Sequence, residues 1–192
     1  MKGFGRRLGL VGMLVAVILA GASTARAQIA APKPAAPASG DGFTVGYTDF
    51  GPVIGLGAID GADISVGGRF EHAFKELPNA GNGVLAFGAS VDFYRYDLSP
   101  FGSFTYTPIG GFVNYHFRLQ NTKIDPFAGV GLGNYVVTTP VNCTGCSYNS
   151  GVYLIAHGGV RYFYRPNLAF YADVGAYAGA LHVGVMFKPK GR

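Results

Sequence analysis

Large apolar residues alternate with small or polar ones through most of this chain, and this pattern constrains its fold more than any other feature. The clearest segment places Leu85, Phe87 and Phe93 on one face and Ser90 and Asp92 on the other. Successive side chains of a β-strand point to opposite sides of the sheet, so a period of two predicts a strand with one apolar face.

The same alternation occurs in eight segments, and turn-forming sequences such as DLSPFG and RPN separate them. From residue 44 onward, no run has the period of a helix. We therefore predict an all-β fold of eight antiparallel strands joined as hairpins. The segments are 51–59, 64–71, 85–94, 104–117, 125–137, 152–163, 168–175 and 181–188.

The face opposite the aliphatic one decides which kind of eight-stranded fold to expect. It carries Gly, Ser, Asn, Tyr and a few charges of both signs, and only 13% of the chain is charged. Such a face is too sparsely charged to be a water-exposed surface, but it suits the narrow interior of a small barrel. We predict an eight-stranded, up-and-down transmembrane β-barrel whose aliphatic face meets lipid.

Charged residues on the predicted inner face are the candidate site. They form a salt-bridge network that occludes the lumen, or alternatively a gate or narrow ion path. Occlusion is favoured because eight strands enclose little more than their own side chains, whereas open pores use about 16 strands. These residues are Arg69, Glu71, Asp92, Arg161 and Asp173.

Tyrosines near the segment ends are expected to form the interfacial aromatic belts of such a barrel. They are Tyr94, Tyr96, Tyr106, Tyr115, Tyr135, Tyr162 and Tyr164.

The N-terminal residues 1–27 have a basic start, an apolar run and the small-residue motif Ala25-Arg26-Ala27, as in a secretory signal peptide. We expect cleavage after Ala27. Residues 28–42 are rich in Pro and Ala and predict an extended tether. The barrel is expected over residues 43–188, followed by a basic tail at 189–192.

The formal charge of +5 does not indicate a nucleic-acid-binding surface. Four of the 15 basic residues lie in the signal peptide, which leaves 11 basic against 10 acidic residues. No dense basic face remains to collect phosphates, so no nucleic-acid partner is expected.

The two cysteines, Cys143 and Cys146, lie in a CTGC segment. Because export favours oxidation, we expect a disulfide within a loop. A thioredoxin-like site would need a strand-to-helix junction there, and a metal site would need two further ligands nearby.

Four histidines are the other candidates for chemistry, and three of them, His116, His157 and His182, fall on the inner face. We interpret these as hydrogen-bonded interior residues, with His72 on the outer face. Neither His157 nor His182 is followed by a serine spaced for nucleophilic attack. No catalytic residue, metal or cofactor is therefore predicted, and we do not expect an enzyme.

Three stretches carry a family resemblance: GGFVNYHF at 110–117, IDPFAGVGLG at 124–133 and the final hairpin at 168–188. Together they resemble the small outer-membrane β-barrels of Gram-negative bacteria, the OmpA/OmpX-type barrels of the porin family. The resemblance implies an outer-membrane location, insertion by the barrel assembly machinery, and both termini in the periplasm.

The function expected from these observations is a structural or surface-interaction role in the cell envelope, performed by a monomer surrounded by outer-membrane lipids. One alternative is a narrow or gated channel for small or hydrophobic solutes. Another is a secreted soluble barrel that binds an apolar ligand, which requires the aliphatic face to point inward. A surface-binding role would use the loop at 139–150, the one sizeable loop that the sequence predicts.

Overall fold

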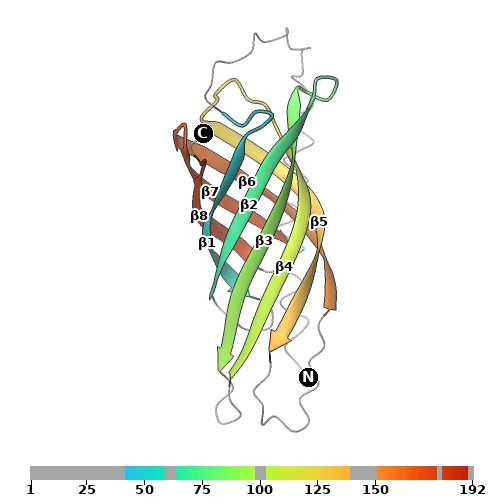
Figure 1. Ribbon diagram of the computed structural model, residues 1–192, viewed down its shortest axis with the longest axis vertical. Coiled ribbons are helices and arrows are strands. Elements are labelled where there is room, and N and C mark those ends of the chain that lie inside the picture. The colour runs from blue at the N-terminus through green and yellow to red at the C-terminus, as the bar shows by residue number, and fades with distance from the viewer. Residues whose placement is uncertain (1–41, 59–63, 98–102, 139–150, 177–178, 190–192) are drawn as a thin grey trace, which may run out of the picture. The chain divides into compact units, whose positions relative to one another are not determined.

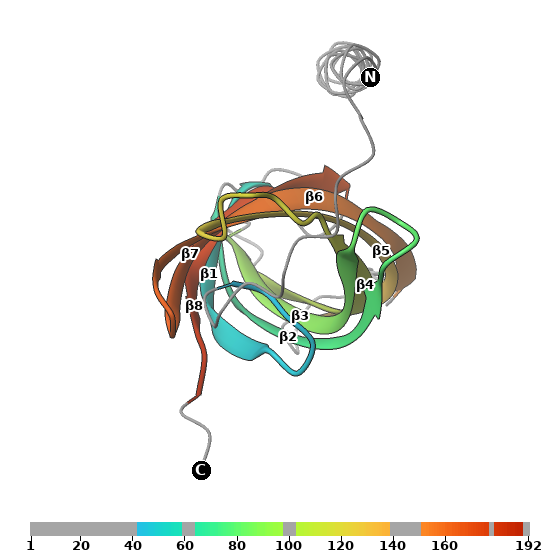
Figure 2. The ribbon, with the colours of Figure 1, turned by 90° about the horizontal axis from the view of Figure 1, so that it is seen from above.

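The strands of the protein close into a single antiparallel barrel. The computed structural model describes residues 42–58, 64–97, 103–138, 151–176 and 179–189. In these ranges each strand pairs with its neighbour in sequence, and β1 also pairs with β8 (Figures 1 and 2). The predicted eight-stranded up-and-down barrel is confirmed. The strands are β1 (Thr48–Ala58), β2 (Ile64–Leu77), β3 (Gly83–Asp97), β4 (Ser103–His116), β5 (Ile124–Thr138), β6 (Gly151–Arg165), β7 (Leu168–Ala176) and β8 (Gly179–Phe187).

Closure of the barrel gives β1 a hydrogen-bonded neighbour on both sides. Ile54 on β1 lies opposite Val66 on β2 and opposite Val183 on β8. Each of the described strands therefore has a partner on both sides, so the sheet presents no open edge. We call the end where β1 begins and β8 ends the terminal rim; the β2–β3, β4–β5 and β6–β7 turns lie there too.

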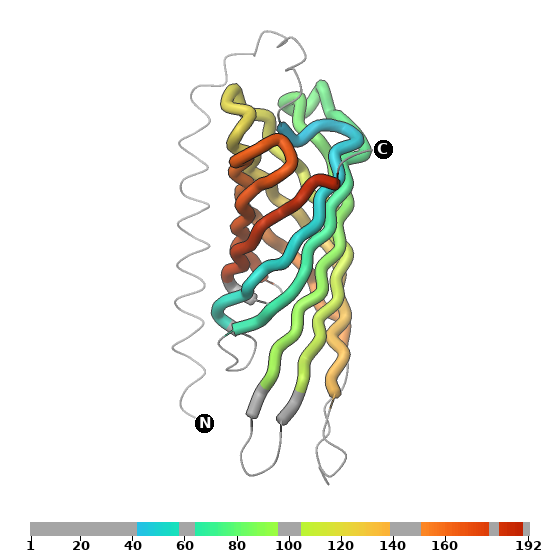
Figure 3. Tube along the Cα trace, turned by 60° about the vertical axis from the view of Figure 1, so that its left-hand side comes forward, coloured from blue at the N-terminus to red at the C-terminus, as the bar shows by residue number. Residues whose placement is uncertain are grey.

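The walls of the barrel are uneven in length. β3, β5 and β6 each have 15 residues, whereas β7 and β8 have nine. Figure 3 shows β3, β4 and β5 extending beyond the β1–β2 hairpin at the end opposite the terminal rim.

The alternation read from the sequence sorts the side chains between outside and inside. On β3, Phe87 and Phe93 are 47% and 49% exposed, whereas Ser90 and Asp92 are 4% and 0% exposed. The outer surface is therefore a broad apolar belt to which every strand contributes. Representative members are Ile54, Val66, Phe87, Val113, Leu132, Leu154, Phe170 and Val183.

This orientation bears on the soluble ligand-binding alternative, which needs the aliphatic residues inside. They lie outside, so the structure contradicts that alternative. The buried apolar side chains form a smaller cluster in the lumen, which includes Phe127 on β5, Phe163 on β6 and Met186 on β8. Ile155, which interrupts the polar face of β6, also faces the lumen and is 1% exposed.

One part of the aromatic-belt expectation is wrong. Tyr94 is 2% exposed because it follows the outward Phe93 and therefore points into the lumen. Tyr135 stacks on Tyr153, with ring centroids 5.4 Å apart, instead of facing outward. Tyr162 and Tyr164, which are 45% and 58% exposed, do lie on the outer surface.

Several predictions fall outside the described residues: the signal peptide, the tether up to residue 41, and the disulfide between Cys143 and Cys146. Within the described ranges, no α-helix combines the length and the hydropathy that a bilayer span requires.

Candidate functional site

All five charged residues that the sequence singled out lie in the lumen and are at most 4% exposed. The strands position them by alternation. β2 places Arg69 and Glu71 two residues apart on its inner face, and β3, β6 and β7 bring in Asp92, Arg161 and Asp173. Glu71 and Arg161, which are 90 positions apart in sequence, thus meet in one buried polar network.

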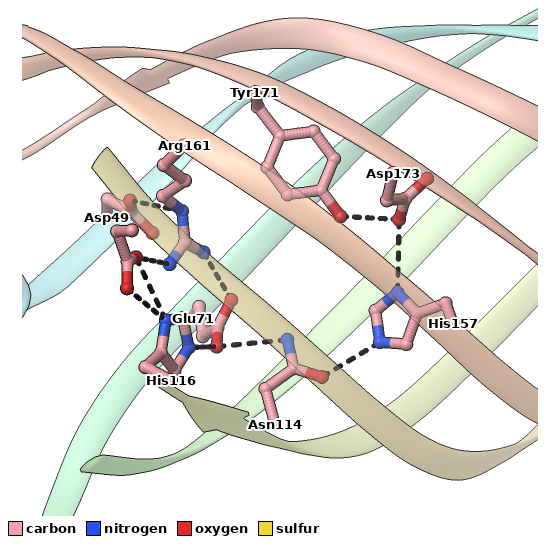
Figure 4. A network of polar contacts seen from close by, with 9 residues as sticks. Asp49, Glu71, Asn114, His116, His157, Arg161, Tyr171 and Asp173 are labelled. Carbon is pink, nitrogen blue, oxygen red and sulfur yellow. Dashed lines mark hydrogen bonds and ion pairs between the residues drawn. The ribbon is translucent and has the colours of Figure 1, made fainter. Parts of the chain in front are cut away.

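Arg161 is the centre of the first group (Figure 4). Its guanidinium forms an ion pair with Glu71 and lies 3.4 Å from Asp49 and 3.4 Å from Asp125. These carboxylates come from β2, β1 and β5, whereas Arg161 comes from β6. One cation therefore joins four strands, and its own side chain is fully buried.

His116, at the end of β4, connects the same carboxylates from another side. Its Nδ1 lies 2.9 Å from an Asp125 oxygen, and its Nε2 lies 2.6 Å from a Glu71 oxygen. Both ring nitrogens thus face a carboxylate, which fixes the plane of the ring.

Asn114 joins this group to the next one (Figure 4). Its amide nitrogen donates to Glu71 over 3.1 Å, and its amide oxygen lies 2.8 Å from Nε2 of His157. An amide suits this position because it carries a donor and an acceptor on one short side chain.

Asp173 is the centre of the second group. It accepts a hydrogen bond from the Tyr171 hydroxyl over 2.6 Å, and it lies 3.0 Å from Nδ1 of both His157 and His182. The other nitrogen of His182 lies 3.8 Å from Asp92, which forms a 3.0 Å ion pair with Arg69. The polar contacts thus form an almost continuous chain through the lumen.

Glycines make room for these side chains. A Cβ atom on Gly67 would collide with the Asp92 carboxylate, and one on Gly129 would collide with the Asn114 amide. The small residues of the inner face are therefore spaces that the polar groups occupy, as expected for a narrow barrel.

Residues 43–47, just before β1, fold into the terminal mouth of the barrel. The Phe43 ring stacks on His116 with centroids 3.7 Å apart and lies 4.8 Å from the Arg161 guanidinium. Tyr47 is 2% exposed, and backbone hydrogen bonds join Gly46 and Tyr47 to Ala73. Burial raises the pKa of the Tyr47 phenol above its ordinary value, and the nearby carboxylates add to the rise.

Sequence analysis missed Asp49, Asn114 and Asp125 as members of the network. The alternation pattern could have identified two of them, because Asp49 precedes the outward Phe50, and Asp125 follows the outward Ile124. Extending the segment at 51–59 back by two residues would have placed Asp49 inside, and the alternation of the segment at 125–137 already places Asp125 there.

The network joins carboxylates to cations and hydrogen-bond donors. In the part of the chain that the structure describes, no group of three or more His, Cys, Asp or Glu side chains is arranged to hold a metal. The chemistry that the geometry itself provides is the cross-linking of strands by buried ion pairs and hydrogen bonds.

Solved structures of two other proteins have a similar fold. The barrel is similar to the crystal structure of the N-terminal β-barrel domain of OprF from Pseudomonas aeruginosa, with 17% identity and a TM-score of 0.51. That match covers 76% of this chain and 100% of the other. Neisserial surface protein A gives 16% identity and a TM-score of 0.52, over 75% of this chain and 97% of the other. No protein-family model matches the sequence, and no curated protein matches it significantly. The expected likeness to small outer-membrane barrels is thus confirmed at the level of the fold.

Proposed function

We propose that the protein is an integral outer-membrane β-barrel with a structural or surface-interaction role in the cell envelope. The observation that carries this proposal is the apolar belt, in which side chains as large as Leu132 and Leu154 are 60% and 76% exposed. Monomeric soluble proteins rarely leave a continuous apolar surface of this extent in water. In a bilayer the same surface meets hydrocarbon.

The closed backbone ladder supports the same proposal. Hydrocarbon offers no hydrogen-bond partner, so a spanning sheet must satisfy every N–H and C=O group internally. The pairing of β1 with both β2 and β8 meets this requirement. The signal-like residues 1–27 support export, and the similarity to OprF and Neisserial surface protein A supports an outer-membrane destination.

A filled lumen favours a structural or surface role over general diffusion. Arg161, Tyr94, Ile155 and Met186 all project inward and are at most 2% exposed. Their side chains, with the ion pairs around them, occupy the space that a diffusion pore would leave to water.

Gel mobility tests the membrane proposal. The mature chain, extracted from outer membranes, is run on a denaturing gel with and without boiling, because a closed barrel resists detergent until it is heated. We expect a mobility shift on boiling. A single unshifted band that comes from the soluble fraction would refute the proposal.

A narrow or gated channel is the second candidate, and the nearly continuous polar chain from Asp49 to Arg69 favours it. Planar-bilayer recording separates the two roles. Occlusion predicts no conductance above that of the bare bilayer. Conductance that disappears in Asp92→Asn or Arg161→Met would instead establish the channel.

A further inference from the structure

We propose that the terminal rim binds the headgroups of anionic phospholipids through a ring of exposed cations. This inference rests on the proposed membrane insertion and adds a lipid class to it. The cations come from the ends of β2 and β6, from the β4–β5 turn and from the residue that precedes β5. They are Lys75, Arg118, Lys123 and Arg165.

The four cations lie at one end of the barrel because of its up-and-down topology. β2, β4 and β6 all end at the terminal rim, and β5 begins there. The opposite end differs in composition. By sequence, the connections 59–63, 98–102, 139–150 and 177–178 contain two Asp and no Lys or Arg.

Each cation lies next to an outward-facing apolar or aromatic residue, where the belt ends. The exposed fractions of these neighbours run from 37% to 58%. Lys and Arg at such a boundary can keep their stems on apolar surface while the charge reaches the headgroups. The pairs are Phe74–Lys75, Phe117–Arg118, Ile124–Lys123 and Tyr164–Arg165.

Two irregularities in the sheet produce this arrangement on β2 and β6. The register of β2 against β3 shifts between Ala73 and Lys75, and that of β6 against β7 shifts between Phe163 and Arg165. A bulge of this kind re-aims side chains at the rim of a barrel. As a result, Lys75 and Arg165 are exposed along with the aromatic residue that precedes each.

Little negative charge on the rim opposes these cations. Glu76 is exposed and forms a 3.2 Å ion pair with Arg118. The other carboxylates whose side chains are described, from Asp49 to Asp173, are buried in the lumen. The rim thus keeps a surplus of positive charge, mainly from Lys75, Lys123 and Arg165, that fits a phosphate headgroup.

Lys188 lies at the same rim, but it is left out of the ring. Its ammonium group is 4.9 Å from the centre of the Tyr47 ring, at the mouth of the barrel.

A cation near a membrane surface contributes about 1 kcal/mol to the attraction between the protein and an anionic lipid, which is about a fivefold preference.

The test uses the mature chain refolded into phosphatidylcholine vesicles that hold a trace of spin-labelled phosphatidylglycerol or spin-labelled phosphatidylcholine. We expect the motionally restricted fraction to favour phosphatidylglycerol about fivefold at low salt. Molar salt should reduce this preference toward one, because exposed charges are screened. The triple variant K75Q/K123Q/R165Q should show no preference even at low salt.

Arg95→Gln is the matched control, since Arg95 is exposed but lies near the other end of β3; it should keep the preference. The single variant Lys123→Gln, which should lower the preference partly, guards against misfolding of the triple variant. Equal association of the two lipids with the wild type, or a preference that survives in the triple variant, would overturn the inference.

Two further measurements show whether free phosphate binding or a failure of membrane insertion explains the result. If inorganic phosphate displaces the labelled lipid better than sodium chloride of equal ionic strength, the rim binds free phosphate, and the lipid inference is wrong. The gel shift on boiling is measured on the same vesicles. Its absence would overturn the membrane proposal, whereas a shift without lipid preference would overturn this inference alone.

Discussion

Replacing Arg161 by Met tests whether the buried network holds the barrel together. The substitution keeps an unbranched, flexible side chain but removes the guanidinium that lies among Asp49, Glu71 and Asp125. Removing one partner of a buried ion pair typically costs about 3–5 kcal/mol, because the remaining charge has no compensation. Three carboxylates lose a shared cation here, so we expect the upper part of that range.

Urea unfolding of the protein in lipid vesicles measures this loss. The chain contains no Trp, so circular dichroism and the heat-dependent gel shift serve as probes. The midpoints are compared only if the free energy of unfolding falls with urea concentration at the same slope in both proteins. A different slope would mean that unfolding exposes a different amount of surface. Arg165→Met is the control, because Arg165 belongs to the same strand but is exposed; its loss should stay below about 1 kcal/mol.

A double-mutant cycle sharpens the test. With Glu71→Gln already present, Arg161→Met should cost less, and the coupling should fall within about 0.5–3 kcal/mol. The reasoning is refuted if Arg161→Met destabilises the barrel no more than Arg165→Met does. In that case the three carboxylates would not depend on Arg161 for their stability.

Three further predictions concern the close packing of β4 and β5, the lipid-facing surface, and the Asn114 amide that joins the two groups of the network. Gly131→Val should abolish the heat-shifted gel band, because a Cβ atom at this position would collide with the backbone of β4. Gly111→Val is the control and should refold normally, because a Cβ atom there has no neighbour closer than 4.0 Å. Leu132→Arg should destabilise the barrel by about 2–4 kcal/mol in vesicle unfolding, and an unchanged midpoint would mean that this face does not meet hydrocarbon. Asn114→Leu should cost about 1–3 kcal/mol in the same assay, since Glu71 loses a buried donor; full stability would show that water replaces the amide.

The alternation of side chains was sufficient to predict the number of strands and the side of the sheet that each residue occupies. Phe87 and Asp92 were assigned to opposite faces of β3 by their positions alone, and both assignments hold. The same rule places Tyr94 inside, so assigning it to the outer belt on the basis of residue type was wrong. Position in the alternation outweighed residue type because the pleat directs each side chain.

Partners in the network could not be predicted in this way. Alternation places Glu71 and Arg161 on the inner face, but it does not indicate that they meet across the lumen, 90 positions apart in sequence. That contact depends on the stagger of the strands and on closure of β1 against β8, neither of which is a local property. The folding of Phe43 onto His116 was missed for the same reason, since it joins the start of the barrel to the end of β4.

The sequence by itself thus determined the class of fold and the inner or outer position of each strand residue, because the period-two pleat is a local property of the backbone. Only the tertiary structure decided which polar groups pair and which segment covers the terminal mouth. It also decided where the exposed cations gather. These contacts join residues far apart in sequence, and closure of the barrel is what brings them within a few ångströms of one another.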